Sequence, residues 1–240
     1  MPYVSRPSAP AAASGGGAAS DPIAANAETL TIGDWEDVED FNGLVGQAFL
    51  TMSQAGAALT FQPTAGTHYS GARWQDAIPA GDFLIAADIF IARTEDASFR
   101  PGIEGLIGVS PGGLEAVSPS WYGAGIDGKA NTAATIVPRG WYRESSALWA
   151  GVGFSAVTAV GGYAYRFAIE RVGTTITIWY VGPQDNLIQL GSRTNAAVAG
   201  ECDLFIRTQG SSDAGNSRYV TLKALALDGL AIEGNRLVSA

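Results

Sequence analysis

The sequence predicts an all-β protein, an antiparallel β-sandwich of two sheets preceded by an extended N-terminal arm. Three observations favour this fold class. Short runs in which apolar and polar residues alternate recur along the chain, as in half-buried strands. Turn-forming clusters separate these runs, in a chain of 240 residues with 31 Gly and 11 Pro. With 47% hydrophobic and 15% charged residues, the chain can bury a sizeable core.

The clearest antiparallel pattern lies between Gly162 and Ser192. In its first strand, aromatic or apolar residues alternate with small or charged ones. The aromatic and apolar face consists of Tyr163, Tyr165, Phe167 and Ile169. A turn containing Gly173 leads into a second strand, which places on one face Ile176, Ile178 and Tyr180. A second turn, from Gly182 to Asn186, precedes a shorter third strand. The segment therefore predicts a three-stranded meander.

This meander resembles the central hairpins of concanavalin A-like (laminin-G-like) jelly-roll domains, which occur in phage virion and fibre proteins and in lectins. The resemblance rests on an arm of the form YxFxIxR, a glycine turn, the run TIxIWYV and a short polar turn. It covers Gly162 to Ser192 best and extends more loosely from about Asp34 to Asp228. It implies a two-layer antiparallel jelly roll and brings no diagnostic catalytic motif.

The chain divides into a low-complexity arm at residues 1–27 and a sandwich domain at residues 28–240. The arm consists mostly of Ala, Gly, Ser and Pro, and it has almost no side chain that could build a core. Such a segment is expected to be disordered by itself. We therefore expect the arm to be held by other proteins of a larger assembly, and the alternative is an arm that lies on its own domain.

Five carboxylates lie close together after the arm, at Asp34, Glu36, Asp37, Glu39 and Asp40. Their spacing does not match a calcium-binding EF-hand loop. A solvated, self-repelling edge is the favoured interpretation, and a divalent metal site is the alternative. The spacing of Trp35, Val38 and Phe41 also indicates a single helical turn or an irregular entry to the sandwich.

The remaining strands are predicted from short apolar runs between turns. They lie at residues 47–52, 58–62, 69–74, 83–92, 103–109, 114–117, 203–208 and 219–227. The run 83–92 is the most apolar and is predicted to be a central strand. In the last strand, alternation places Val220, Leu222 and Ala224 on one face and Thr221, Lys223 and Leu225 on the other. The tail from Leu230 to Ala240 either adds an edge strand or reaches a neighbouring molecule.

Charge and composition exclude several classes of partner. The formal net charge is -9 and the sequence pI is about 4.5, so the overall field opposes nucleic-acid binding. No apolar run is long enough for membrane insertion, and the N-terminus lacks the pattern of a signal peptide, so synthesis in the cytoplasm is expected. The single cysteine, Cys202, is predicted to be a buried structural thiol.

No motif of an enzyme is found in the sequence. The Glu-x-Asp-x-x-Glu strand that many jelly-roll glycoside hydrolases carry is absent. A Ser-His-Asp hydrolase would have to use the only histidine, His68, but the sequence contains no Gly-x-Ser-x-Gly motif for the nucleophile. Lectins that share the resemblance often use calcium, but the loop acids Asp127, Asp185 and Asp213 are scattered. The sequence thus predicts a protein that is not an enzyme and has no cofactor or metal.

Half of the six tryptophans fall between Pro119 and Gly151, in a segment that is expected to form an aromatic-rich loop. Sugar rings stack on aromatic rings, and nearby polar groups bind their hydroxyls. The predicted site contains Trp121, Tyr122, Trp141 and Tyr142 as stacking residues and Arg143 and Glu144 as hydrogen-bonding residues. The alternative is that these rings close one end of the sandwich or fill a subunit interface.

These observations predict a non-enzymatic structural or adhesion component of a large assembly. The favoured assembly is a bacteriophage virion, in which a decoration, fibre or tail-associated protein, expected to be a homo-oligomer, is anchored by residues 1–27 and exposes its sandwich for host attachment. It would be assembled in the host cytoplasm. The alternative is a lectin module or receptor-binding protein for a cell-surface glycan, and a glycoside hydrolase is the third hypothesis.

Overall fold

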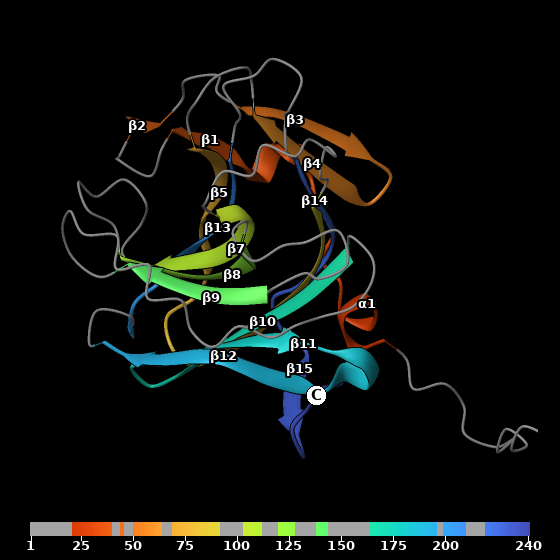
Figure 1. The fold of residues 1–240 in the computed structure, drawn as a ribbon, viewed down its shortest axis with the longest axis vertical. Helices are drawn as coiled ribbons and strands as arrows, with labels where there is room; N and C mark the ends of the chain where they lie inside the picture. The colour runs from red at the N-terminus through yellow and green to blue at the C-terminus, as the bar shows by residue number, and fades with distance from the viewer. Residues whose placement is uncertain are drawn as a thin grey trace, which may run out of the picture.

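The structure is a computed structural model, and it confirms the all-β jelly-roll prediction. It describes residues 21–39, 44–45, 50–63, 69–91, 103–111, 120–127, 138–143, 164–195, 199–209 and 219–240. Two antiparallel seven-stranded sheets, A and B, face each other (Figure 1). No helix in these ranges is both long and apolar enough to cross a membrane.

Each sheet combines hairpins of consecutive strands with neighbouring strands that are far apart in the sequence. The order across sheet A is β2 (Leu44–Val45), β1 (Glu36–Glu39), β5 (Tyr69–Ile78), β13 (Cys202–Gln209), β7 (Ile103–Pro111), β8 (Trp121–Asp127) and β9 (Pro138–Arg143). The order across sheet B is β12 (Leu187–Thr194), β11 (Thr175–Val181), β10 (Ala164–Val172), β6 (Phe83–Ile91), β14 (Val220–Ala226), β4 (Ala58–Pro63) and β3 (Leu50–Ala55). A separate hairpin joins β15 (Leu230–Glu233) and β16 (Arg236–Ser239).

The predicted meander is present as β10, β11 and β12. Gly173, at φ +59°, lies in the turn between β10 and β11, and Phe167 pairs with Tyr180 across these strands. The aromatic face of β10 points into the core, where Phe167 and Ile169 are buried. The apolar run predicted as a central strand is β6, which lies in the middle of sheet B.

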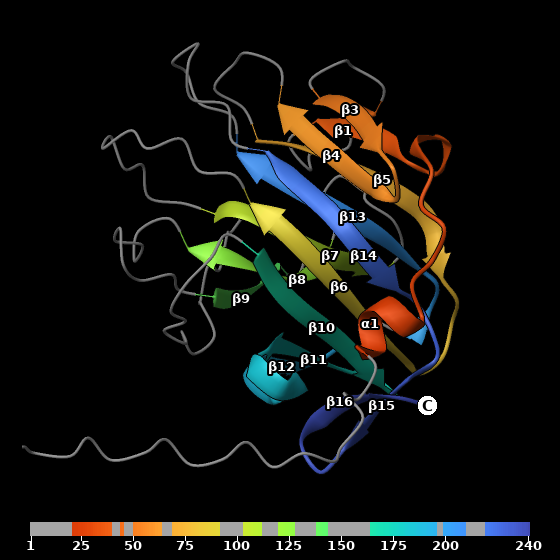
Figure 2. The ribbon, with the colours of Figure 1, turned by 90° about the vertical axis from the view of Figure 1, so that its right-hand side faces the viewer.

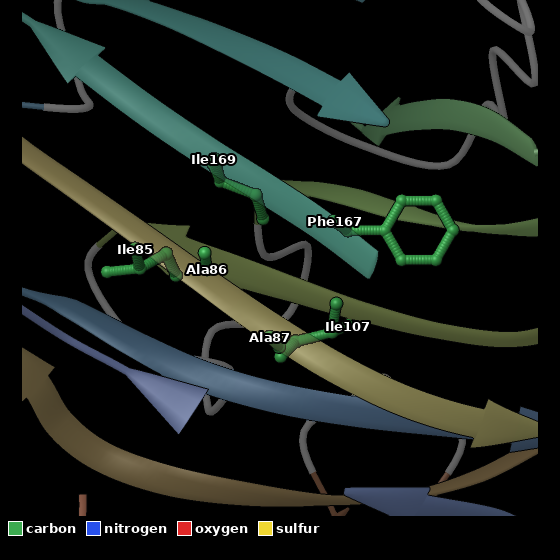
Figure 3. Close-up of a pocket in the computed structure, with 6 residues that line it drawn as sticks. All are labelled: Ile85, Ala86, Ala87, Ile107, Phe167 and Ile169. Carbon is green, nitrogen blue, oxygen red and sulfur yellow. The ribbon is translucent and has the colours of Figure 1, made fainter. Parts of the chain in front are cut away.

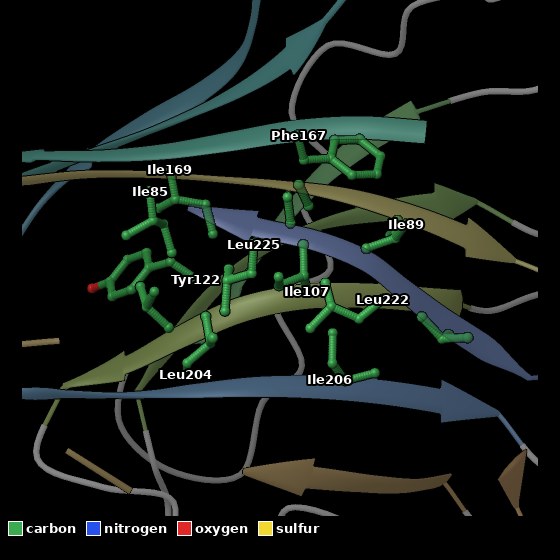
Figure 4. Packing of buried hydrophobic residues seen from close by; sticks show 14 of the residues in the cluster. Ile85, Ile89, Ile107, Tyr122, Phe167, Ile169, Leu204, Ile206, Leu222 and Leu225 are labelled. Carbon is green, nitrogen blue, oxygen red and sulfur yellow. The ribbon is translucent and has the colours of Figure 1, made fainter. Parts of the chain in front are cut away.

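The main core lies between the two sheets and consists of aliphatic and aromatic side chains from both (Figure 4). Alternate residues of each strand contribute to it, as Ile107 of β7, Leu204 of β13 and Leu222 of β14 show. The space lined by Ile85, Ala86, Ala87, Ile107, Phe167 and Ile169 has no room even for a water molecule (Figure 3). This part of the core is therefore closely packed and holds no ligand.

A second apolar cluster covers part of the outer face of sheet B. The short helix α1 (Pro22–Ala25) packs there beside the β15–β16 hairpin (Figure 2). Ile23 of α1 is 0% exposed and belongs to one cluster with Ala168 of β10 and Leu237 of β16. The C-terminal tail therefore folds onto its own domain, as a separate hairpin and not as an edge strand of either main sheet.

The described part of the chain begins within the range that the sequence assigns to the arm. Asp21 accepts hydrogen bonds from the backbone N–H groups of Ile23 and Ala24, and Pro22 begins the helical turn. The Asp21 carboxylate also pairs with Arg166 of β10. Residues 21–27 thus contact the sandwich, whereas residues 1–20 lie outside the described ranges. The anchoring role of the arm stays a prediction.

Two local predictions are corrected by the structure. The segment 119–151 was expected to be a loop, but Trp121–Asp127 and Pro138–Arg143 are strands that pair with each other. In β14, a bulge between Leu222 and Ala224 interrupts the alternation, so Leu225 points into the main core and not to the face of Thr221. The strand predicted at 114–117 lies outside the described residues.

One buried cation links the turns at one end of the sandwich. Arg171 of β10 is 0% exposed, and its guanidinium donates hydrogen bonds to the carbonyl oxygens of Pro79 at 2.8 Å, Gly200 at 2.6 Å and Gly81. It also donates to the Sγ of Cys202 at 3.3 Å. Burial raises the pKa of the Cys202 thiol to about 11, although Arg171 opposes this shift. The thiol is therefore buried, as the sequence predicts, and neutral near pH 7.

Replacing this cation should destabilise the fold. We expect Arg171→Met to lower the free energy of unfolding by about 3 kcal/mol or more, because several carbonyl oxygens lose their donors in a place that water does not reach. Urea unfolding measures the change. Arg236→Met is the control, since Arg236 is exposed and its Nε donates a single bond to the carbonyl oxygen of Gln184. Equal losses for the two variants would contradict the role of Arg171.

Candidate functional site

Five of the six predicted site residues lie on two neighbouring strands, β8 and β9, at one edge of sheet A. In the register of this pair, Tyr122 faces Tyr142 and Trp121 faces Arg143. Successive side chains of a strand point to opposite faces of the sheet. Both tyrosines belong to the main core between the sheets, whereas Trp121 and Trp141 belong to a separate cluster. The structure therefore divides the predicted set between the inner and the outer face of sheet A.

The two tyrosines face sheet B. The Tyr122 hydroxyl accepts a hydrogen bond from Nδ2 of Asn195 at 3.0 Å. The guanidinium carbon of Arg193 lies 4.0 Å from the centroid of the Tyr142 ring. Asn195 follows β12 and Arg193 lies in it, so these contacts join the edges of the two sheets. This position matches the alternative in which the rings close one end of the sandwich.

The two tryptophans lie on the outer face of sheet A with residues of two other strands. Their cluster also contains Leu106 of β7 and Phe205 of β13. The rings of Trp121 and Phe205 meet edge to face, with centroids 5.8 Å apart and an interplanar angle of 79°. Trp121 is 1% exposed and Trp141 is 6% exposed. Trp141 is thus the more accessible of the two rings.

Glycines of β7 and β8 make room for this cluster. A Cβ atom on Gly108 would lie 2.4 Å from Cζ of Phe205 and 2.6 Å from the carbonyl oxygen of Tyr122. A Cβ atom on Gly125 would lie 2.1 Å from the carbonyl oxygen of Gly105. The missing side chains let Phe205 lie flat across the outer face of the sheet.

Arginines surround the aromatic cluster. The guanidinium carbon of Arg207 lies 5.9 Å from the centroid of the Trp121 ring, and Arg207 is buried. Arg143 is buried beside Trp121 on the neighbouring strand, and Arg139 of β9 is half-buried. We name the outer surface formed by Trp121, Trp141, Phe205, Arg139, Arg143 and Arg207 the Trp-Arg face.

The described carboxylates beside the Trp-Arg face are held by a further arginine. Nε and Nη2 of Arg73 donate to Oε2 of Glu36 at 3.0 and 2.8 Å, and Nη1 lies 3.5 Å from Oδ2 of Asp203. Oδ1 of Asp203 accepts from the backbone N–H of Asp76 at 2.9 Å, where β5 bulges. Both acids therefore have structural partners.

The structure thus brings together Trp121, Trp141 and Arg143 and separates them from Tyr122 and Tyr142, while Glu144 lies outside the described residues. Phe205 and Arg207 were missed by the sequence analysis, because they come from a strand far along the chain. The alternation along β13 could have indicated them, because both residues lie on the face opposite to the core residues Leu204 and Ile206. A large aromatic residue followed by an arginine on that face indicates that the outer face is packed as well.

The acidic segment offers no metal site in the described part of the chain, where no group of three or more His, Cys, Asp and Glu side chains is placed to hold an ion. Oδ2 of Asp34 accepts from the Thr31 hydroxyl at 2.7 Å, and Oδ2 of Asp37 accepts from the backbone N–H of Leu50 at 3.2 Å. Asp185, one of the scattered loop acids, pairs with Arg166 at 2.7 Å.

Comparison with known proteins identifies the fold. No protein-family model and no curated protein sequence matches the chain. Among solved structures, the chain is similar to the Ca²⁺-bound exoplasmic/lumenal domain of VIP36, with a TM-score of 0.54 and 7% identity over 91% of this chain and 93% of that one. Peanut lectin is similar with a TM-score of 0.51 and 8% identity over 83% of this chain and 93% of that one. The chain therefore has the concanavalin A-like jelly-roll fold, which confirms the resemblance seen in the sequence.

The VIP36 domain is also similar in the form bound to Ca²⁺ and Man3GlcNAc. That structure has a TM-score of 0.54 and 8% identity over 85% of this chain and 86% of that one. The protein is thus a lectin-like β-sandwich in its architecture, and its ligand has to be argued from its own residues.

Replacing Gly108 tests how tightly the Trp-Arg face is packed. We expect Gly108→Ala to lower the free energy of unfolding by about 1–3 kcal/mol, because the new methyl group meets both a ring and a backbone oxygen. Thermal or urea unfolding measures the change, and tryptophan fluorescence reports on Trp121. Gly200→Ala is the control, since the described residues place no heavy atom within 4 Å of its Cβ. A Gly108→Ala protein as stable as the control would show that the ring of Phe205 is not confined.

Proposed function

We propose that the protein is a non-catalytic carbohydrate-binding protein that holds a glycan against the Trp-Arg face. One observation carries this proposal: Trp121 and Trp141 lie in one cluster on the outer face of a lectin-like sheet, with arginines on the same and the next strands. Tryptophan rings stack on the C–H faces of sugars, and guanidinium groups donate several hydrogen bonds in a fixed geometry.

The edge strand β9 is where a glycan first meets this face. Alternation places Arg139, Trp141 and Arg143 on the same side of β9, and the exposure of Arg139 and Trp141 exceeds that of Trp121. Trp121 and Phe205 then support Trp141 from the inner side of the cluster. Since Trp141 is only 6% exposed, binding requires its ring to become more accessible to the sugar.

The two carboxylates that the structure describes beside this face favour binding over hydrolysis. A glycosidase needs one carboxylic acid and one carboxylate that flank the scissile bond. Glu36 and Asp203 are instead both bound to Arg73, and Asp203 also accepts the Asp76 backbone N–H group. Because these contacts hold both carboxylates in place within the sheet, neither is free to act on a glycosidic bond. They therefore support a protein that binds a glycan without cleaving it.

Substitutions on β9 test the proposal. We expect Trp141→Ala and Arg139→Gln each to weaken binding to an immobilised glycan panel about tenfold, which corresponds to the loss of one ring stack or one charged hydrogen bond. Arg139→Gln is the sharper variant, because a half-buried polar side chain can be replaced without opening a cavity. Arg236→Gln, on the C-terminal hairpin, should bind normally. If Arg139→Gln and a folded Trp141→Ala protein bind like the wild type, the Trp-Arg face is not the glycan site.

A role as an anchored component of a bacteriophage virion is a second proposal. The observation that favours it is the position of Asp21, where the packed chain begins on the outer face of sheet B, away from the Trp-Arg face on sheet A. Attachment through residues 1–20 would start from the side of the sandwich opposite to the glycan site. The particle, the partner of the arm and the oligomeric state all belong to this proposal.

Two truncations test the anchor. Removal of residues 1–20 should leave the melting temperature unchanged and abolish incorporation into the particle. Removal of residues 1–27 should also lower the melting temperature, because Ile23 and the pair between Asp21 and Arg166 are lost. Scanning calorimetry and co-purification with particles measure the two effects. Normal incorporation of the chain that lacks residues 1–20 would contradict the anchoring proposal.

A further inference from the structure

We propose that the outer face of sheet B carries a second saccharide-binding site, formed by Asp88, Phe90, Tyr219 and Lys223. We name these four residues the Asp88 patch. The patch belongs to the opposite layer of the sandwich from the Trp-Arg face, so it binds its ligand independently. Its ligand is a neutral sugar that offers both a C–H face and hydroxyl groups.

The strands place these side chains on one outer surface. In β6, Ile89 points into the main core, so its neighbours Asp88 and Phe90 point outward. In β14, which pairs with β6, the bulge between Leu222 and Ala224 turns Lys223 to an exposed position. Asp88, Phe90 and Tyr219 are half-buried. Unlike the rings of the Trp-Arg face, the aromatic groups of this patch are accessible in the structure.

The aromatic part of the patch suits a sugar ring. The centroids of Phe90 and Tyr219 are 6.2 Å apart, and the rings are tilted by 41°. Nζ of Lys223 lies 5.5 Å from the Phe90 centroid. Two partly exposed rings with a charged donor at their side offer a stacking surface and a hydrogen bond to a ring hydroxyl.

Asp88 contributes an acceptor that the protein does not use. Its cross-strand neighbour is Arg166, whose Nη1 is bound to Asp185 at 2.7 Å and whose Nη2 is bound to Asp21, while the Arg166 Nε is buried without a partner. In the described part of the chain no donor bonds to the Asp88 carboxylate, and its Oδ1 is buried. Burial raises the pKa of Asp88, whereas Arg166 and Lys223 lower it and Asp21 raises it further. Because Oδ1 is shielded from solvent, a donor from outside the protein reaches the carboxylate through Oδ2.

The combination of groups selects the class of ligand. A sugar hydroxyl can donate to the Asp88 carboxylate, and an adjacent hydroxyl can accept from Nζ of Lys223. An apolar ligand would leave both charges without hydrogen bonds, and an anionic ligand would meet the charge of Asp88. The hydroxyls of Thr60 and Thr221, 2.9 Å apart on the neighbouring strands, extend the polar surface beside Phe90. A neutral oligosaccharide fits these groups best.

Saturation-transfer NMR on the full-length protein tests the patch, with cellotetraose, maltotetraose and mannotriose as probes. We expect at least one probe to receive saturation. Asp88→Ala and Lys223→Gln should each weaken its binding about tenfold, because each removes a charged hydrogen bond. Lys223 is exposed, so its variant keeps the fold. Glu170→Gln is the matched control, since Glu170 is a half-buried carboxylate on the outward side of β10, and it should bind like the wild type.

The variants of the Trp-Arg face separate this inference from the proposed function. Binding that survives Trp141→Ala and Arg139→Gln but is lost with Asp88→Ala and Lys223→Gln supports the second site. Binding that is lost only with the β9 variants overturns the second site and leaves the proposed function standing. Absence of saturation transfer to all three probes, or equal binding by wild type, Asp88→Ala and Lys223→Gln, also overturns it.

Discussion

The structure depends on the hydrogen bonds that a single buried guanidinium makes at one end of the sandwich. Arg171 ends the first strand of the central meander, and its donors reach the turn before β6 and the segment before β13. These connections belong to different sheets. A charge without water must satisfy its donors within the protein, so the carbonyl oxygens of Pro79, Gly81 and Gly200 are fixed in position. The relative placement of β6 and β13, and hence of both outer faces, follows from this constraint.

Side chains of a strand point alternately to the two faces of the sheet. This alternation explains why the meander could be predicted from the sequence and why the aromatic site could not. The meander was predicted with its inner face, because Phe167 and Ile169 alternate with polar or small residues over a whole strand. The same period separates Trp121 from Tyr122, which stand side by side in the sequence but on opposite faces of sheet A. Glycines and polar residues around these pairs indicated a loop, although β8 and β9 pair with each other and β8 also pairs with β7.

Other features depend on contacts that a single sequence does not contain. Phe205 and Arg207 reach Trp121 only because β13 and β8 both flank β7. The bulge at Lys223 reverses the faces of the residues that follow it, and no glycine or proline marks it. Residues 21–27 look like the rest of the arm in composition, so the sequence does not reveal that Ile23 is buried and that Asp21 pairs with Arg166. The glycan site and the assembly role, which rest on partners outside the chain, stay predictions.

The first and the last described segments of the chain are close neighbours. Nδ2 of Asn26 donates to the Ser239 hydroxyl at 3.0 Å, and the backbone N–H of Ala240 donates to the carbonyl oxygen of Gly229 at 2.8 Å, so α1 and β16 lie side by side (Figure 2). A domain whose entry and exit points coincide can be inserted into a surface loop of a host protein without stretching it. The same proximity makes the sandwich suited to circular permutation, with a short linker between the old ends.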